Sequence, residues 1–263
     1  MPGWFPDPWN PGQLRFNDGR QWTGHIQPVP SSSGFPVEGT FRFPLEQPVL
    51  VLLPSPRRAD VDVACTVQDA HGRELASITP RGKRPSALGR DTEDLDFVVV
   101  ASNGAQRLRI SRLGGFGQRH RVVVRGPSGQ ELGRLQQTSG FLRQFRTPRL
   151  SMTLESAGRP LGYTDVCLEP EQTRFSEVEA PIVGAGGAPL ATVWRTWHYV
   201  DTISDFFEYR LSCPRPQPWP VPDLLLASVF SHYLYDRLSA GGPLSTYNRF
   251  GRGGTWHDST NRW

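Results

Sequence analysis

The sequence predicts a mainly β protein, a closed antiparallel barrel with a small β-hairpin module in front of it. Three observations lead to this fold class: frequent chain breakers, a repeated hairpin and one late apolar helix. Of the 263 residues, 27 are glycine and 25 are proline, which excludes a helical bundle because few stretches reach a full helix length without a breaker. The 37% hydrophobic content can still fill a sizeable core.

Residues 1–26 are aromatic and turn-rich, and they predict the small β-hairpin module. Asp18-Gly19 supplies a turn between residues 14–16 and 21–23. Trp4 and Trp22 are expected to stack on nearby prolines, because about 25 residues cannot bury enough surface to fold without such clamps. The motif residues are Trp4, Pro6, Asp7, Pro8, Asp18, Gly19, Trp22 and His25.

With its W-F-P-D-P start and D-G-R-Q-W-T turn, this module resembles a short domain of unknown function found mainly at the N-termini of actinobacterial proteins. The resemblance implies no established activity. Residues 27–40 follow as a Pro/Ser-rich linker, whose composition cannot bury enough apolar surface to fold.

A glycine followed within four residues by leucine recurs along the body of the chain, residues 41–240. Runs of alternating Val, Ile and Leu flank each glycine, and glycine tolerates the positive φ that a tight hairpin turn requires. Ten or more successive antiparallel strands favour closure into a barrel, because closure removes the exposed edges. The repeated glycines are Gly72, Gly104, Gly129, Gly158 and Gly187, which are 25 to 32 residues apart.

One apolar helix is predicted over residues 223–238, after the proline-rich segment 214–222. Asp223 is placed to act as its N-cap. Apolar side chains point in nearly every direction around this helix, so it must be buried. We expect it to lie inside the barrel, with Leu225, Val229, Phe230 and Tyr233 filling the interior.

The repeated hairpins, the segments Trp194–Trp197 and Phe206–Leu211, and the final apolar helix occur in an order that resembles the phospholipid scramblase and LURP-one-related branch of the tubby-like fold. The resemblance covers residues 41–240. It implies a tubby-like barrel of about twelve antiparallel strands around a C-terminal helix. Residues 241–263, rich in Gly, Arg, Ser and Asn, are expected to form a disordered tail.

The sequence lacks the common catalytic signatures, and we predict no catalytic residue, metal or cofactor. Its three cysteines are far apart and favour a reducing compartment. Scramblases carry an acidic calcium segment where this chain has residues 201–212, but Ile203 offers no oxygen ligand at the third position and Ser212 stands where a closing carboxylate is needed. The acidic run at residues 91–96 is expected to be a solvated turn.

Basic residues gather in three segments of the body, and we expect them at connections or strand starts. There several arginines could converge on an anionic head group; an ordinary solvated basic surface is the alternative. Nucleic acid is not predicted as a partner, because the net charge is only +4 and no recognition motif accompanies the arginines. The candidate residues are Arg81, Lys83, Arg84, Arg119, Arg121, Arg143, Arg146 and Arg149.

Taken together, these features predict a non-enzymatic binding or scaffold protein of the cytoplasm that docks on anionic lipid head groups at the inner face of the membrane. No segment is long and apolar enough to span a bilayer. Two alternatives stay open. One is an adaptor that binds another protein through the N-terminal module, and the other is a hydrolase that uses His198 with Asp201 or Asp205 at the barrel mouth. The oligomeric state is not predicted.

Overall fold

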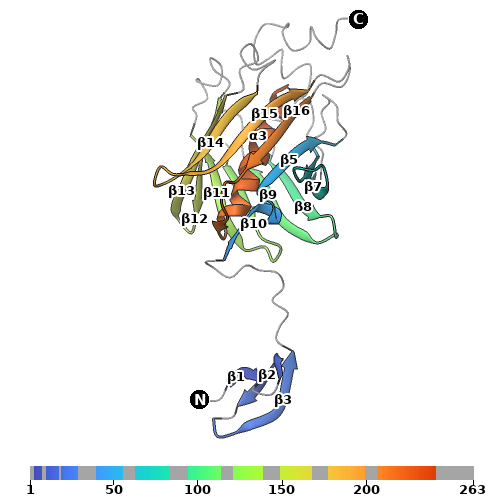
Figure 1. The fold of residues 1–263 in the computed structure, drawn as a ribbon, viewed down its shortest axis with the longest axis vertical. Helices are drawn as coiled ribbons and strands as arrows, with labels where there is room; N and C mark the ends of the chain where they lie inside the picture. Colours follow the sequence, from blue (N-terminus) through green and yellow to red (C-terminus); the bar gives the residue numbers. More distant parts are fainter. Residues whose placement is uncertain are drawn as a thin grey trace, which may run out of the picture. The chain divides into compact units, whose positions relative to one another are not determined.

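The chain forms two compact units, residues 1–40 and 41–263. Figure 1 shows the ribbon of the computed structural model. The residues that the structure describes are 3–7, 10–17, 19–28, 40–55, 63–82, 94–113, 121–138, 149–167, 177–198 and 206–240. The predicted disordered tail at residues 241–263 lies outside them.

The N-terminal unit is a three-stranded antiparallel sheet of order β1-β2-β3, built from β1 (Gly3–Asp7), β2 (Asn10–Asn17) and β3 (Trp22–Pro28). The predicted hairpin is confirmed as β2 and β3, with Gly19 at a φ of 94° in the turn. Strand β1 adds to it, and β3 continues for two residues into the segment that was expected to be a linker. The Arg15 guanidinium donates to the Thr23 carbonyl at 3.0 Å and ties β2 to β3.

Part of the predicted aromatic core lies outside what the structure describes. Pro8 and Asp18 are not described, and Trp4 and Pro6 are described by their backbone alone. The expected stacking of Trp4 and Trp22 on these prolines therefore stays a prediction. Trp22, the first residue of β3, is 37% exposed.

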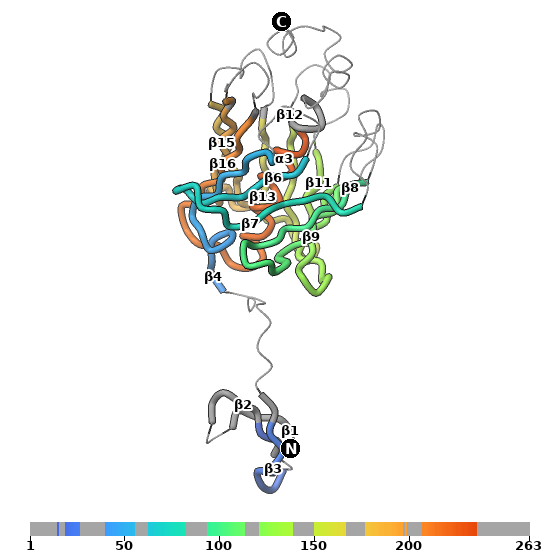
Figure 2. Tube along the Cα trace, turned by 90° about the vertical axis from the view of Figure 1, so that its right-hand side faces the viewer, coloured from blue at the N-terminus to red at the C-terminus, as the bar shows by residue number. Residues whose placement is uncertain are grey.

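The second unit is a closed antiparallel barrel in which each strand pairs with its neighbours in sequence (Figures 1 and 2). Strand β16 pairs with β5 and closes the barrel. The twelve strands are β5 (Val49–Pro54), β6 (Cys65–Gln68), β7 (Glu74–Pro80), β8 (Leu95–Ala101), β9 (Gln106–Leu113), β10 (Arg121–Arg125), β11 (Glu131–Gln137), β12 (Arg149–Ser156), β13 (Arg159–Cys167), β14 (Val178–Gly184), β15 (Pro189–His198) and β16 (Phe206–Ser212). The predicted mainly β fold class with a closed barrel is confirmed.

Because consecutive strands are antiparallel, their connections alternate between the two ends of the barrel. At one end the turns are short, and all five predicted glycines have a positive φ, between 73° and 89°. We call this the glycine-turn end. At the other end the connections are longer, and we call it the long-connection end. The connections of the long-connection end are residues 55–64, 81–94, 114–120, 138–148, 168–177 and 199–205.

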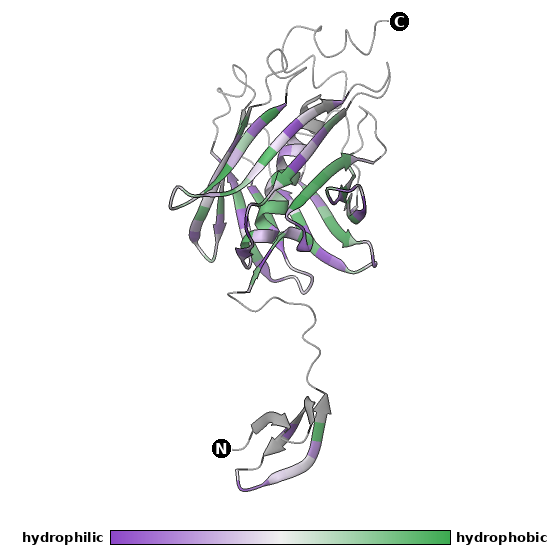
Figure 3. Cartoon of the chain, viewed as in Figure 1, coloured by the Kyte–Doolittle hydropathy of each residue, from purple (hydrophilic) through white to green (hydrophobic). Residues whose placement is uncertain are grey.

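Helix α3 (Val221–Ala240) fills the barrel, and Figures 1 and 2 show it running between the strands. Every side chain from residue 221 to residue 235 is buried. Leu225, Val229, Phe230 and Tyr233 have no exposed surface, so the predicted filling of the interior is confirmed. Burial alternates along the strands: in β6, Cys65 and Val67 are buried while Thr66 and Gln68 are half-buried. Figure 3 shows apolar and polar residues mixed along the strands of the barrel.

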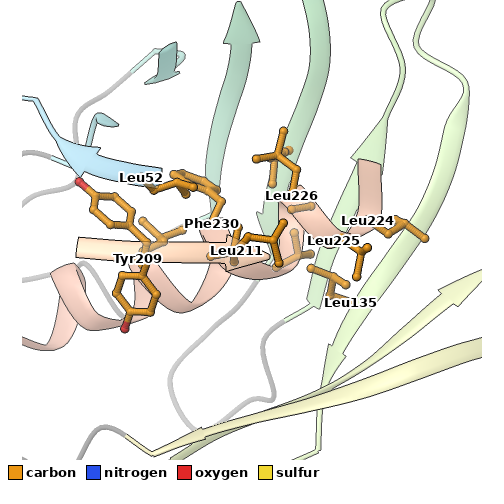
Figure 4. Close-up of a cluster of buried hydrophobic side chains, with 14 of the residues drawn as sticks. Leu52, Leu135, Tyr209, Leu211, Leu224, Leu225, Leu226 and Phe230 are labelled. Atoms are coloured by element: carbon orange, nitrogen blue, oxygen red, sulfur yellow. The ribbon is translucent and has the colours of Figure 1, made fainter. Parts of the chain in front are cut away.

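The centre of the core is a cluster in which strand side chains meet the helix from several directions (Figure 4). The Phe230 ring lies edge-on to Phe97, with 4.9 Å between centroids, and stacks on Tyr233 at 5.9 Å. Gly133 of β11 has no room for a Cβ, which would collide with the Glu155 carbonyl oxygen of β12 and lie 2.9 Å from a Leu224 methyl carbon of the helix. The helix and the strands are therefore packed without room for a larger side chain at this contact.

The helix begins at Val221, two residues before the predicted start, and Asp223 lies in its first turn instead of acting as the N-cap. Pro222 is compatible with this early start because the first helical turn needs no backbone donor there. The Asp223 carboxylate accepts a 2.6 Å bond from Arg42, which belongs to β4 (Phe41–Arg42). Burial raises the pKa of Asp223, with Arg42 acting against it. Asp223 therefore anchors the helix to the start of the unit, where β4 pairs with β17 (Gln217–Pro218).

A few polar groups of α3 lie inside the barrel. His232 Nε2 lies 3.2 Å from Thr164 Oγ1, and the Tyr233 hydroxyl donates to the Ala64 carbonyl at 2.9 Å. Burial lowers the pKa of His232 to about 3. The native barrel therefore holds a neutral imidazole at neutral and mildly acidic pH.

We predict that Phe230→Ala lowers the free energy of unfolding by about 3–5 kcal/mol, because it removes a fully buried ring and leaves a cavity. Urea denaturation monitored by tryptophan fluorescence measures the change. Phe41→Ala is the control, since Phe41 is 66% exposed and its loss should alter stability by less than about 0.5 kcal/mol. Equal losses in the two variants would contradict the packed interior.

We predict that His232 makes the protein less stable as the pH falls from 7 to 5. Below an unfolded pKa of 6.5 the unfolded chain binds a proton that the native state excludes until about pH 3, so acid favours unfolding. The contribution of His232 should amount to about 2 kcal/mol between pH 7 and pH 5. Urea denaturation of the wild type and of His232→Leu at both pH values tests this, and identical pH dependence would refute it.

Candidate functional site

Strand topology brings three of the eight predicted basic residues to the long-connection end of the barrel. Arg81 directly follows β7, Arg121 begins β10 and Arg149 begins β12, and all three positions lie at this end. The expected location at connections or strand starts is confirmed for these three. The other five predicted residues, Lys83, Arg84, Arg119, Arg143 and Arg146, belong to the same three connections but lie outside the described residues.

The three basic connections follow one another around the barrel, because β7 to β12 are neighbours in the sheet. Segments 81–94, 114–121 and 138–149 together contain nine basic and three acidic residues. The next two connections around the same end, residues 168–177 and 199–205, contain one basic and five acidic residues. In sequence, the three connections between β7 and β12 are therefore basic, and the next two connections are acidic.

Below the long-connection end, the outer face of β8, β9 and β10 carries a hydrogen-bonded cluster of polar side chains. The Asp96 carboxylate accepts two bonds of 2.9 Å from Arg109 Nε and one of 2.7 Å from the Ser111 hydroxyl. Arg109 Nη2 lies 2.7 Å from the same carboxylate. Arg125 Nη1 in turn donates to the Ser111 oxygen at 3.2 Å. A single network thus holds two guanidinium groups on adjacent strands.

Partial burial of Asp96 favours its protonated form, but the hydrogen bonds from Arg109 and Ser111 outweigh this, so the pKa of Asp96 is lowered. Arg81 contributes to this lowering of the pKa, which places its positive charge near the same carboxylate. The hydrogen bond to Asp96 raises the pKa of Arg109. Arg121 lies on the same face. We define the basic wall as four arginines, one aspartate and one serine of this face: Arg81, Asp96, Arg109, Ser111, Arg121 and Arg125.

The acidic run at residues 91–96 is only partly as expected. Asp96 is not part of a solvated turn but the second residue of β8, where its side chain is about three-quarters buried. Arg109, Ser111 and Arg125 are wall residues that the sequence reasoning missed. Their signal is a spacing of two along a strand, which places alternate side chains on one face: Arg107, Arg109 and Ser111 on β9, and Arg121 and Arg125 at the ends of β10.

The alternative catalytic pairing of His198 with Asp201 or Asp205 stays a prediction, because only His198 belongs to the described residues. His198 Nε2 lies 3.0 Å from the Glu208 carboxylate on the outer face of the barrel. Asp201 and Asp205 lie outside the described residues. In the segment 201–212, which corresponds to the calcium segment of scramblases, residues Phe206–Ser212 form strand β16. Among the described residues, no group of three His, Cys, Asp or Glu side chains is arranged to hold a metal ion.

Two arginines face the inside of the barrel near the long-connection end. Arg195 of β15 is 1% exposed, and its guanidinium carbon lies 3.5 Å from the centre of the Phe207 ring. Arg112 of β9 is 4% exposed. Stacking on an aromatic face is a favourable environment for a buried guanidinium. These residues belong to the core and are distinct from the basic wall.

The residues of the N-terminal motif lie on the small sheet. Trp4, Pro6 and Asp7 belong to β1, and Trp22 and His25 belong to β3. His25 is exposed, with Nδ1 3.4 Å from the Thr23 hydroxyl. These positions belong to the three-stranded sheet of the N-terminal unit.

The fold and the wall define the class of protein: a closed antiparallel barrel filled by its C-terminal helix, with one basic outer face and a separate small sheet. The family described as "Protein of unknown function (DUF2510)" matches residues 2–34. This match agrees with the domain of unknown function that the N-terminal motif resembles. No curated protein and no solved structure matches the chain. In the described part of the chain, no helix has both the length and the apolar character needed to cross a bilayer.

We predict that Asp96→Asn lowers the free energy of unfolding by about 1 kcal/mol, because Arg109 and Arg125 then face each other without a carboxylate. The loss should shrink in high salt, which screens the repulsion. Urea denaturation of Asp96→Asn, Arg109→Gln and the double variant measures the coupling. Glu131→Gln, which breaks an exposed pair with Arg134, is the control. Additive losses in the double variant would show that Asp96 and Arg109 do not interact.

Proposed function

We propose that the protein is a non-enzymatic binding protein of the cytoplasm that docks on anionic lipid head groups at the inner face of the membrane. The observation that supports this most is the order of the strands, which places three basic connections side by side at the long-connection end. The resemblance of the body to scramblase-like and LURP-one-related barrels of the tubby-like fold is consistent with this role.

Electrostatics favours binding of anionic lipid by the outer surface of the barrel over binding in an internal pocket. A basic residue near an anionic leaflet contributes about 1 kcal/mol, so several neighbouring arginines together support peripheral binding. Arg81 and Arg121 are exposed at the long-connection end, and neither forms an ion pair with another described residue. The filled interior supports a role for the outer surface, because Leu225, Phe230 and Tyr233 occupy the space in which a ligand would lie.

The second proposed role is that of an adaptor that binds another protein through the N-terminal unit. The exposure of two apolar side chains on β3 favours it: Trp22 is 37% exposed and Ile26 is 52% exposed. Both belong to β3, in a stretch where the pairing of β2 with β3 shifts register, and a Cβ at Gly24 between them would have no atom within 4 Å. Exposed apolar side chains of this kind suit a partner protein better than a charged membrane surface.

We predict that the protein co-sediments with vesicles of phosphatidylcholine and phosphatidylserine and does not bind vesicles of phosphatidylcholine alone. Arg81→Gln combined with Arg121→Gln should weaken binding by roughly thirtyfold, because two charges near the surface are lost. The matched control is Arg159→Gln combined with Arg215→Gln, which removes two exposed arginines at the glycine-turn end.

Three outcomes would count against membrane docking by the long-connection end. Negligible binding to both vesicle types would reject membrane docking. Equal effects of the two double variants would reject docking through the long-connection end. A loss of vesicle binding in Trp22→Ala at unchanged stability would transfer the role to the N-terminal unit.

A further inference from the structure

We propose that Arg109 and Arg125 form a discrete site for a single phosphate group on the basic wall, with Asp96 and Ser111 as positioning residues. This inference rests on the proposed function for its biological setting, and it names the chemical group that the wall recognises. The ligand chemistry is that of a phosphomonoester, carried either by a lipid head group or by a small soluble molecule.

The first argument is the register of β9 and β10. Arg125 is paired directly with Arg109. Directly opposite residues in an antiparallel pair have Cβ atoms about 4.5–5.5 Å apart, and like charges in such positions destabilise a sheet. Asp96 provides one negative charge for the two guanidinium groups. The pair therefore keeps an uncompensated positive charge, which an anion would neutralise.

The second argument is the number of donors that remain. A guanidinium has five N–H donors. Arg109 directs Nε and Nη2 toward Asp96, and Arg125 uses Nη1 for its bond to Ser111. Arg125 is half-buried and forms no ion pair with a described residue. Donors of both side chains are thus left for a ligand on the same face.

The third argument is that the donors are held in place. The Ser111 hydroxyl gives its proton to Asp96 and accepts from Arg125, so one serine connects the two arginines through bonds of 2.7 and 3.2 Å. Two flexible arginines without such partners lose side-chain entropy when they bind an anion. Here the hydrogen bonds to Asp96 and Ser111 already restrict the two arginine side chains in the folded protein, so less side-chain entropy is lost on binding. An arrangement fixed in advance favours a compact, multiply charged anion over diffuse surface charge.

Phosphate fits these donors better than a carboxylate does. A phosphomonoester carries close to two negative charges at neutral pH and presents three oxygens, whereas a carboxylate carries one charge and two oxygens. Guanidinium forks match phosphate geometry. Arg121 and Arg81, which lie toward the long-connection end of the same wall, supply further positive charge around the site.

The experiment has a soluble arm and a membrane arm, both with the full chain. In the soluble arm, glycerol 3-phosphate is titrated into the protein and its affinity is measured by calorimetry. Arg125→Gln should weaken binding by roughly tenfold or more, as expected for the loss of a charged hydrogen-bond donor. Arg159→Gln, which removes an exposed arginine at the glycine-turn end, should change affinity less than about twofold. Arg125→Lys keeps the charge without the fork and should give an intermediate loss.

In the membrane arm, phosphatidylcholine vesicles contain either phosphatidic acid, a phosphomonoester, or phosphatidylserine at equal surface charge. Wild type should prefer phosphatidic acid, and Arg125→Gln should remove the preference while retaining residual binding. Thermal unfolding of each variant checks that the fold is intact.

The outcomes separate the two proposals. Binding to both lipids without preference and without an effect of Arg125→Gln would overturn the phosphate site and leave membrane docking intact. Binding of glycerol 3-phosphate that depends on Arg125, without binding to any vesicle, would support the phosphate site and reject membrane docking. Equal effects of Arg125→Gln and Arg159→Gln in the soluble arm would also overturn the site.

Discussion

The structure of the barrel depends on the burial of helix α3, which is apolar on every side. A helix of this kind cannot lie on a surface, because one face would then remain in water. A closed sheet encloses it completely, and the helix in turn fills an interior that twelve strands would otherwise leave empty. The aromatic contacts of Phe230 with Phe97 and Tyr233 lie where helix and strands meet. The closed sheet therefore needs the helix to fill it, and the helix needs the closed sheet to be buried.

Because the barrel is closed and filled, its outer surface and its two ends are the parts that a partner could reach, and strand order decides how those ends differ. The glycine turns are short, so few side chains lie at the glycine-turn end. All long connections of the barrel lie at the opposite end, so the charge of that end can differ from one connection to the next. Between β7 and β12 that charge is positive, and the wall residues Asp96, Arg109 and Arg125 extend it down the outer face. The barrel thus has a polarity that its antiparallel topology imposes.

The barrel could be predicted from the regular spacing of the hairpin glycines, whereas most of the basic wall could not, because its residues come together only through contacts between strands. Gly72 and the other four hairpin glycines can be predicted because only glycine readily takes the positive φ of their turns. The buried helix can be predicted because its sequence has no polar face. Arg121 was found because it stands at a strand start. Asp96 was misjudged because its acidic neighbours suggest solvent, while its partner Ser111 comes from another strand. The start of α3 was misplaced for a similar reason, since Asp223 binds Arg42, a residue remote in sequence.

The position of Asp96 explains how a barrel can hold several arginines on neighbouring strands without losing its sheet. One carboxylate compensates Arg109 and, through Ser111, orients Arg125, so the repulsion across β9 and β10 is reduced but not abolished. Complete compensation would leave a neutral surface with no affinity for an anion. No compensation would cost stability in the strands that enclose the helix. A single aspartate among four arginines lies between these extremes, so the same side chain links the stability of the wall to the charge that the wall presents.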